Sequence, residues 1–68
     1  MQTDKLVHMV NQIARAFAVE GEAKAIAATT GHLRLFWDPR MRREILAHLE
    51  AGGAGLDEVS RAALEGLK

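Results

Sequence analysis

The chain contains few side chains with the chemistry of a catalytic nucleophile. It has no cysteine, which excludes disulfides, thiolate zinc sites and thiol nucleophiles together. Ser60 is the single serine, and we expect it in the first turn of a short helix beside Asp57 and Glu58. No oxyanion-hole glycine motif surrounds Ser60, and the glycine-rich run at 52–55 lacks the lysine and Ser/Thr of a phosphate-binding loop. This inventory argues against an enzyme acting alone.

The histidines offer no better case for a metal site. His8, His32 and His48 lie far apart in the sequence, and no pair has the i, i+4 spacing of a helical zinc site. We therefore expect no catalytic, cofactor-binding or metal-ligating residue in this chain.

The segment 34–43 carries chemistry of a different kind, because it combines aromatic and cationic side chains. It holds two of the three aromatic residues and four of the nine basic residues. Phe36 and Trp37 are adjacent and would project about 100° apart on a helix, so both cannot enter one narrow core stripe. We expect one ring to pack inside and the other to be free for a second surface. Tryptophan, arginine and methionine are also enriched at protein interfaces.

The arginines of this segment are unusual for a monomer. If Pro39 opens a helix, then Arg40, Arg42 and Arg43 lie near its positive end, at a cost of about 0.3–1 kcal/mol each when exposed. Glu44 offsets part of that cost at i+4 from Arg40. We interpret the arginines as facing an anionic partner.

A structural interpretation of the same arginines stays open. Their stems can lie over apolar surface, and Asp38 can pair internally with Arg42 or Arg34.

The charge distribution bears on the partner's identity. Nine basic residues balance nine acidic ones, residues 32–48 carry four arginines against two acids, and residues 49–68 are net acidic. An acidic last third would repel a phosphate backbone, so a protein partner with acidic groups and an apolar groove fits better. The alternative is a small helical nucleic-acid-binding or regulatory domain that uses the same arginines.

The elements that must position these residues are helices. Leu6, Val10, Ile13 and Phe17 recur at helical spacing and predict a helix over 3–19, capped by Thr3 or Asp4. A second helix is expected over 22–36, with a weak middle at 27–31. The residues that keep its apolar period are Ala23, Ile26, Ala27, Thr30, Leu33 and Trp37.

Trp37-Asp38-Pro39 is the sharpest break in the pattern. Proline disfavours helical angles at Asp38, so the second helix should end there and a third should begin at Pro39 with Asp38 as its cap. That helix should run to about Ala51 and end at Gly52-Gly53. After a flexible connection at 51–55, a last helix is expected from Asp57 to about Leu67. The fold class is all-α, a single domain over 1–68 with three to four short helices.

Size and hydropathy complete the expectations. A 68-residue chain can build only a small core, so support from a partner chain would be favourable. No stretch reads as a signal peptide or approaches the length of a membrane span. We expect a cytoplasmic protein without membrane association.

Two strings of the sequence resemble the delta subunit of soluble NAD-dependent, molybdenum-containing formate dehydrogenases. They are Asp-Lys-Leu-Val-His-Met-Val-Asn-Gln-Ile-Ala at 4–14 and Phe-Trp-Asp-Pro-Arg-Met-Arg at 36–42. The likeness continues through 45–49 and 52–56, and it is weakest at 18–31.

The resemblance implies a non-catalytic role within a larger enzyme that oxidises formate to CO2 with reduction of NAD. In that family the catalytic alpha subunit holds molybdenum on molybdopterin guanine dinucleotide together with iron–sulfur clusters. The beta and gamma subunits carry electrons through FMN and further clusters to NAD. The delta subunit binds no redox cofactor and supports assembly, cofactor retention or stability of the active enzyme.

The resemblance and the residue chemistry together predict a helical subunit that docks on the alpha subunit through an aromatic/arginine patch, without nucleic acid. The expected partner-binding residues are Arg34, Phe36, Trp37, Asp38, Pro39, Arg40, Met41, Arg42 and Arg43.

Overall fold

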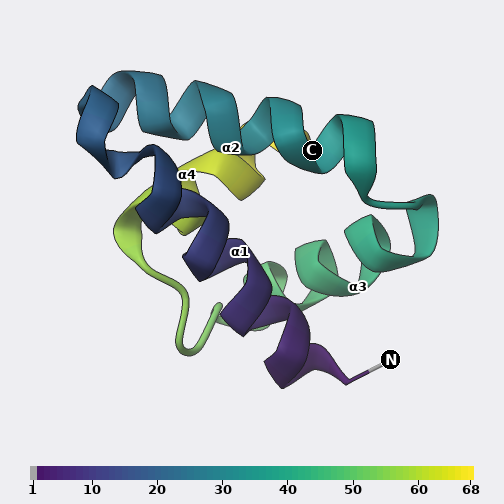
Figure 1. Cartoon of the computed structure of the whole chain (residues 1–68). Coiled ribbons are helices and arrows are strands. Elements are labelled where there is room, and N and C mark those ends of the chain that lie inside the picture. Colours follow the sequence, from purple (N-terminus) through teal and green to yellow (C-terminus); the bar gives the residue numbers. More distant parts are fainter. Residues whose placement is uncertain (1) are drawn as a thin grey trace.

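The computed structural model describes residues 2–68, and Met1 lies outside the described residues. The described chain folds into four α-helices and one 3-10 turn, in agreement with the all-α prediction (Figure 1). The elements are α1 (Thr3–Phe17), η1 (Ala18–Glu20), α2 (Glu22–Phe36), α3 (Pro39–Glu50) and α4 (Glu58–Leu67). α2 crosses one side of the molecule with α4 and α1 packed against it, and α3 lies against α1 and α4.

The helix boundaries follow the local signals in the sequence. The first helix is shorter than the predicted 3–19, because the chain tightens into η1 before Gly21, which has a φ of 96°. α2 has the predicted bounds, and α3 and α4 agree with the expected helices to within one residue at each end. The expected cap of the first helix is wrong. Gln2 occupies the N-cap without a side-chain bond, and Thr3 Oγ1 instead donates to Glu44 Oε2 on α3 at 2.8 Å.

One hydrophobic cluster joins all four helices. It consists of Leu6, Val10, Leu33, Trp37, Ile45, Leu49, Leu56 and Leu64. Of the predicted stripe on the first helix, Leu6 and Val10 are fully buried, whereas Ile13 and Phe17 are half-buried at its margin. The core therefore gathers only one or two large side chains from each helix, together with Trp37 and Leu56 from the connections, as expected for a chain of this size.

The predicted apolar stripe of α2 is partly wrong. Ala23 and Ala27 are exposed, whereas Ala25 and Thr29 are fully buried. Alanine and threonine carry too little apolar surface to fix the orientation of a helix by themselves. The packing of α4 decides it instead.

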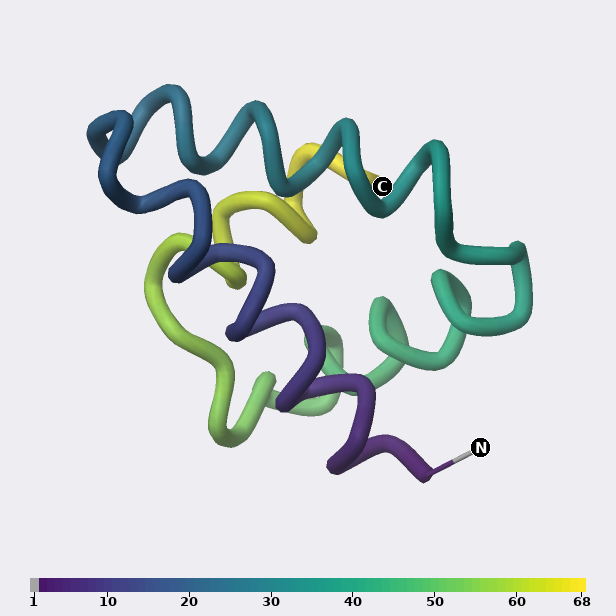
Figure 2. Tube along the Cα trace, viewed as in Figure 1, coloured from purple at the N-terminus to yellow at the C-terminus, as the bar shows by residue number. Residues whose placement is uncertain are grey.

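Small side chains let α2 and α4 approach closely. Thr30 Oγ1 lies 3.0 Å from the Ile26 carbonyl oxygen and 2.9 Å from that of Ala63, so its proton has an acceptor on each helix. A β-carbon added at Gly66 would lie 3.5 Å from Thr30 Oγ1. The trace in Figure 2 follows the C-terminal segment alongside α2. This contact explains why α2 runs without interruption through the predicted weak middle at 27–31.

Glycines end α3 as the sequence predicts. The Gly53 N–H donates to the His48 carbonyl at 2.9 Å and the Gly52 N–H donates to that of Leu49 at 3.1 Å, the two bonds of a Schellman motif. Gly52 has a φ of 118°, which an L side chain rarely adopts. The same loop is then fastened by Arg61, whose Nη2 donates to the Gly52 and Gly53 carbonyls at 3.0 and 2.8 Å.

A buried asparagine ties the loop before α4 to α1. Asn11 Nδ2 donates to the Gly55 carbonyl at 2.9 Å, and its Oδ1 accepts from the Asp57 N–H at 3.0 Å and from Ser60 Oγ at 2.7 Å. We call this group of residues the Asn11 network. Ser60 lies in the first turn of α4, as expected, and its hydroxyl is fully buried in this network. The connection at 51–55, expected to be flexible, is thus bonded to both α1 and α4.

No helix formed by residues 2–68 has the length and hydropathy needed to span a membrane.

Candidate partner-binding site

The turn between α2 and α3 has the geometry predicted from Trp37-Asp38-Pro39. Asp38 is the N-cap of α3, with extended backbone angles, and its Oδ1 accepts from the Met41 N–H at 2.9 Å. Pro39 begins the helix, where its missing N–H costs nothing. The turn brings the end of α2 and the start of α3 together, so the aromatic and cationic residues of 34–43 gather in one region.

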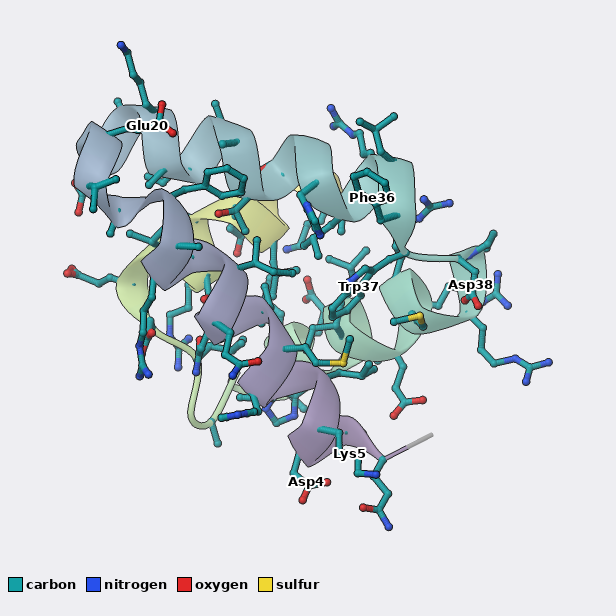
Figure 3. All side chains as sticks on the ribbon, viewed as in Figure 1. Asp4, Lys5, Glu20, Phe36, Trp37 and Asp38 are labelled. Carbon is teal, nitrogen blue, oxygen red and sulfur yellow. The ribbon has the colours of Figure 1, made fainter. Side chains whose placement is uncertain are left out.

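The two adjacent aromatic rings have opposite environments. Trp37 is only 5% exposed and belongs to the central cluster, whereas Phe36 is 70% exposed. Figure 3 shows Trp37 directed into the molecule and Phe36 on the surface at the end of α2. The prediction of one inner and one outer ring is confirmed. Trp37 supports the region from inside and has little surface left for a partner, whereas Phe36 presents most of its ring.

Phe36 does not stand alone on the surface. Its ring centroid lies 4.7 Å from that of His32, and His32 is in turn 6.4 Å from Phe17 at an edge-on angle of 63°. Leu35, the preceding residue, is 79% exposed. The His32–Phe36 contact could have been found from their i, i+4 spacing on a helix. The contact of Phe17 with His32 could not, because it depends on how α1 packs on α2.

Two of the four arginines bond to the ends of helices within the chain. Arg42 Nη1 donates to the carbonyls of Arg34 at 3.0 Å and Trp37 at 2.9 Å, at the C-terminal end of α2. Arg34 Nη2 donates to the Gly66 carbonyl at 2.7 Å, at the end of α4. Both guanidinium groups therefore lie at the negative ends of helix dipoles. For Arg42, this favourable interaction with the end of α2 offsets the unfavourable interaction with the positive end of α3.

The internal ion pairs considered from the sequence do not form. Within residues 2–68 the ion pairs are Arg15–Asp57, Lys68–Glu50 and Lys68–Glu65. Asp38 pairs with neither Arg42 nor Arg34, because its side chain caps α3 while both arginines bond to carbonyls.

Arg40 and Arg43 differ from the other two arginines. Both are exposed. The guanidinium group of neither residue forms a hydrogen bond or an ion pair with any other group of residues 2–68. Glu44, expected to offset Arg40, accepts a hydrogen bond from Thr3 instead. The sequence argument for partner-facing arginines thus keeps its force for Arg40 and Arg43.

An open groove of about 550 Å³ lies where α2, α3 and α4 meet. We call it the arginine groove, and its lining residues are Arg34, Pro39, Arg42, Arg43, Leu46 and Leu67. Leu46 and Leu67 were missed by the sequence analysis, since only the packing of α4 beside α3 brings them to the same place. Met41 packs against the central cluster, half-buried.

The described residues provide no ligand set for a metal. No group of three or more His, Asp or Glu side chains within 2–68 is arranged to hold an ion. His48 bonds to the Ala54 carbonyl at 2.8 Å. The chain has no cysteine, so its residues do not fit an iron–sulfur cluster.

The chain is thus an all-helical domain with exposed aromatic and cationic side chains around the turn between α2 and α3. The chain belongs to the family of the NADH-dependent formate dehydrogenase delta subunit, FdsD, whose family model matches residues 5–64. No curated protein and no solved structure matches the chain. The matched range includes the whole of α2 and α3, and hence the turn at Asp38-Pro39 and every arginine of the groove.

Proposed function

We propose that this chain is a non-catalytic accessory subunit that docks on the catalytic alpha subunit of an NAD-dependent molybdenum formate dehydrogenase. Family membership supports the assignment to a formate dehydrogenase. In this proposal, residues 1–68 act as one helical unit in the cytoplasm, within a complex that also contains the beta and gamma subunits. Molybdenum, iron–sulfur clusters, FMN and NAD belong to those other subunits.

The observation that carries the docking proposal is the coincidence of exposed apolar surface with unpaired cations. Phe36 is 70% exposed next to Leu35 at 79%, and Arg40 and Arg43 are exposed in the first turns of α3. Complete burial of a phenylalanine side chain contributes roughly 1.5–3 kcal/mol, and Phe36 has gained little of this within its own chain. A protein surface that covers the ring and supplies carboxylates would recover it.

The proposed docking surface comprises the exposed side chains around the turn between α2 and α3, together with the arginine groove. Among the residues predicted for partner binding, Phe36, Arg40 and Arg43 offer direct contact, while Trp37, Asp38 and Met41 hold the backbone that presents them. Arg34, Pro39 and Arg42 line the arginine groove, as Arg43 also does. The proposal thus assigns both contact and supporting roles within the predicted segment.

Docking would support the enzyme through thermodynamic linkage. A subunit that binds the folded alpha subunit and not its unfolded chain stabilises the folded form by mass action. The same linkage would slow the loss of a cofactor whose release requires local opening of the alpha subunit. We therefore place the role of the chain in assembly, cofactor retention or stability of the active enzyme.

A deletion experiment with complementation tests this function. The complete dehydrogenase is produced with and without this chain, and formate-dependent NAD reduction is measured together with the molybdenum content of the purified alpha subunit. We expect lower activity and less molybdenum per alpha subunit without the chain, with restoration when it is supplied during assembly. Equal activity, metal content and thermal inactivation in both preparations would contradict the proposal.

A pull-down identifies the partner. With this chain tagged, mass spectrometry should find the molybdenum-bearing alpha subunit among the recovered proteins. Recovery of nucleic acid in its place, with a strong dependence on salt, would favour the nucleic-acid-binding alternative.

A further inference from the structure

The arginine groove combines an apolar floor with cations in a way that restricts its occupant. Pro39, Leu46 and Leu67 supply apolar surface, while Arg34, Arg42 and Arg43 supply positive charge. No acidic residue lines the groove. A ligand that fills it must therefore offer apolar contact and negative charge within a few ångströms of each other.

Arg42 is held in an orientation suited to a carboxylate. Its Nη1 is occupied by the Arg34 and Trp37 carbonyls, at 3.0 and 2.9 Å. A guanidinium group has five N–H donors, so the Nε and Nη2 donors remain, and within residues 2–68 they bond to no acceptor. These atoms form the edge of arginine that binds a carboxylate with two parallel hydrogen bonds.

The neighbouring arginines strengthen this preference. Arg34 is fixed through Nη2 to the Gly66 carbonyl at 2.7 Å and keeps its other donors, and Arg43 keeps all of its own among the described residues. Because two of the three cations are already ordered by carbonyls, a ligand would order fewer side chains on binding. Such preorganisation increases affinity by lowering the entropy cost of association.

We propose that the arginine groove receives an Asp or Glu side chain carried beside an apolar residue on a segment of the alpha subunit. This inference rests on the proposed docking function and specifies the chemistry of the contact. The carboxylate would meet the free edge of Arg42 with Arg43 beside it, and the apolar side chain would cover Leu46 and Leu67. The groove is thus the part of the docking surface that sets specificity, whereas Phe36 adds apolar area.

A phosphate backbone fits the same groove less well. Nucleic acid binding requires a continuous basic track, whereas residues 49–68, which include α4, are net acidic. The apolar floor would also remain uncovered beneath a phosphate.

Site-specific photo-crosslinking in the assembled enzyme tests the proposal. A benzoylphenylalanine is placed at Leu67 and, in a second variant, at Leu46, with an exposed position on α1, Ala16, as the control. We expect both groove positions to crosslink to the same stretch of the alpha subunit, with an Asp or Glu within two residues of an apolar residue. A crosslinked stretch without a carboxylate would overturn the proposal.

Charge reversal provides the second arm. Arg43→Glu should lower the yield of the Leu67 crosslink about tenfold, whereas Lys24→Glu, the same change on the exposed start of α2, should leave it unchanged. An unaltered yield with Arg43→Glu would overturn the proposal.

The two arms separate this inference from the proposed function. If the alpha subunit copurifies with the chain but neither groove position crosslinks to it, then the groove proposal fails and docking stands. If the alpha subunit does not copurify at all, the docking function itself fails.

Discussion

The Asn11 network and the arginine groove differ in how far their polar groups are hydrogen-bonded within the chain. In the network, Asn11 is 9% exposed, and its donor and acceptor atoms bond to Gly55, Asp57 and Ser60. In the groove, Arg42 uses one nitrogen internally, and Arg43 uses none within the described residues. The fold consumes the hydrogen-bonding capacity of the first region and leaves that of the second available.

The same contrast holds for the two rings at the end of α2. Trp37 packs in the central cluster, whereas Phe36 lies outside it and is exposed. Substitution of a residue whose side chain is packed or hydrogen-bonded within the chain should lower stability. Substitution of a residue whose side chain has no such contacts should weaken binding. This separation between stability and binding gives the tests below their direction.

The largest expected difference is between the two adjacent rings. Trp37→Ala would leave a cavity in the central cluster and should lower the free energy of unfolding by about 3–5 kcal/mol, enough to unfold most of so small a chain. Phe36→Ala should change it by less than about 0.5 kcal/mol, because the ring is already largely in water. Urea titration followed by circular dichroism measures the free energy of unfolding of both variants. Equal losses of stability would contradict the assignment of Trp37 to the core and of Phe36 to the surface.

Disruption of the Asn11 network should have the next largest effect. Asn11→Ala leaves the Asp57 N–H and the Ser60 hydroxyl without their acceptor and should cost about 2–3 kcal/mol. Gln12→Ala, at the exposed neighbouring position, is the matched control and should be close to neutral. Thermal unfolding of both variants measures the difference. A loss for Asn11→Ala no greater than that of the control would show that the network is not a stabilising one.

The groove arginines should divide between stability and binding. Arg42→Gln removes the donor to two carbonyls and should cost about 1 kcal/mol of folding free energy, whereas Arg43→Gln should cost nothing measurable. Both variants should retain less alpha subunit in a pull-down. Equal stability of the two variants in urea would contradict the distinction between an anchored and an unanchored arginine.

The smallest effect is expected at the C-terminus. Hydrogen bonding to Glu50 and then Glu65 raises the pKa of Lys68 above its usual value of 10.5. A raised folded pKa gives a stabilisation that is present below the unfolded pKa and lost as pH rises through the folded one. Because Lys68 is fully exposed, the stabilisation should be slight.

Lys68→Met tests this contribution. The melting temperature of the variant should lie only slightly below that of the wild-type chain at pH 8, and the gap should close as the pH rises beyond 10.5 and through the raised folded pKa of Lys68. A gap that widens with rising pH would have the wrong sign for this account.

The sequence predicts the helices and the turn well because their causes are local. Asp38 and Pro39 determine the start of α3 through a cap and a fixed φ, and Gly52 determines its end through a positive φ. The inner and outer rings also follow from their adjacency in the sequence, with Phe36 in the last turn of α2 and Trp37 as its C-cap. Each of these signals lies within a few residues of the feature it produces.

The features that the sequence did not reveal depend on packing between distant segments. Asn11 reaches partners more than forty residues away, and nothing at 8–14 marks it as buried. The buried side of α2 was partly misassigned: Thr30 and Leu33 are buried as predicted, whereas Ala23 and Ala27 are exposed, because alanine is compatible with either environment. Arg42 was expected to seek a carboxylate within the chain or outside it, whereas a carbonyl at the end of α2 takes part of its capacity. Every residue has a backbone carbonyl, so the sequence pattern does not indicate which carbonyl will accept a hydrogen bond from a given arginine.

The central claim is that the cations left free by the fold bind the partner. It is tested most directly by the double variant Arg40→Gln/Arg43→Gln, compared with Arg15→Gln/Lys24→Gln, which removes two charges elsewhere. Each is measured for its unfolding midpoint in isolation and for the alpha subunit it retains in the assembled dehydrogenase. We predict that Arg40→Gln/Arg43→Gln unfolds at or slightly above the wild-type midpoint, because it removes two cations from the positive end of α3. Arg15→Gln/Lys24→Gln should unfold at or slightly below that midpoint, because it removes the exposed Arg15–Asp57 ion pair. Only Arg40→Gln/Arg43→Gln should lose the alpha subunit. Full retention of the alpha subunit by that variant, or its loss by both, would contradict the account.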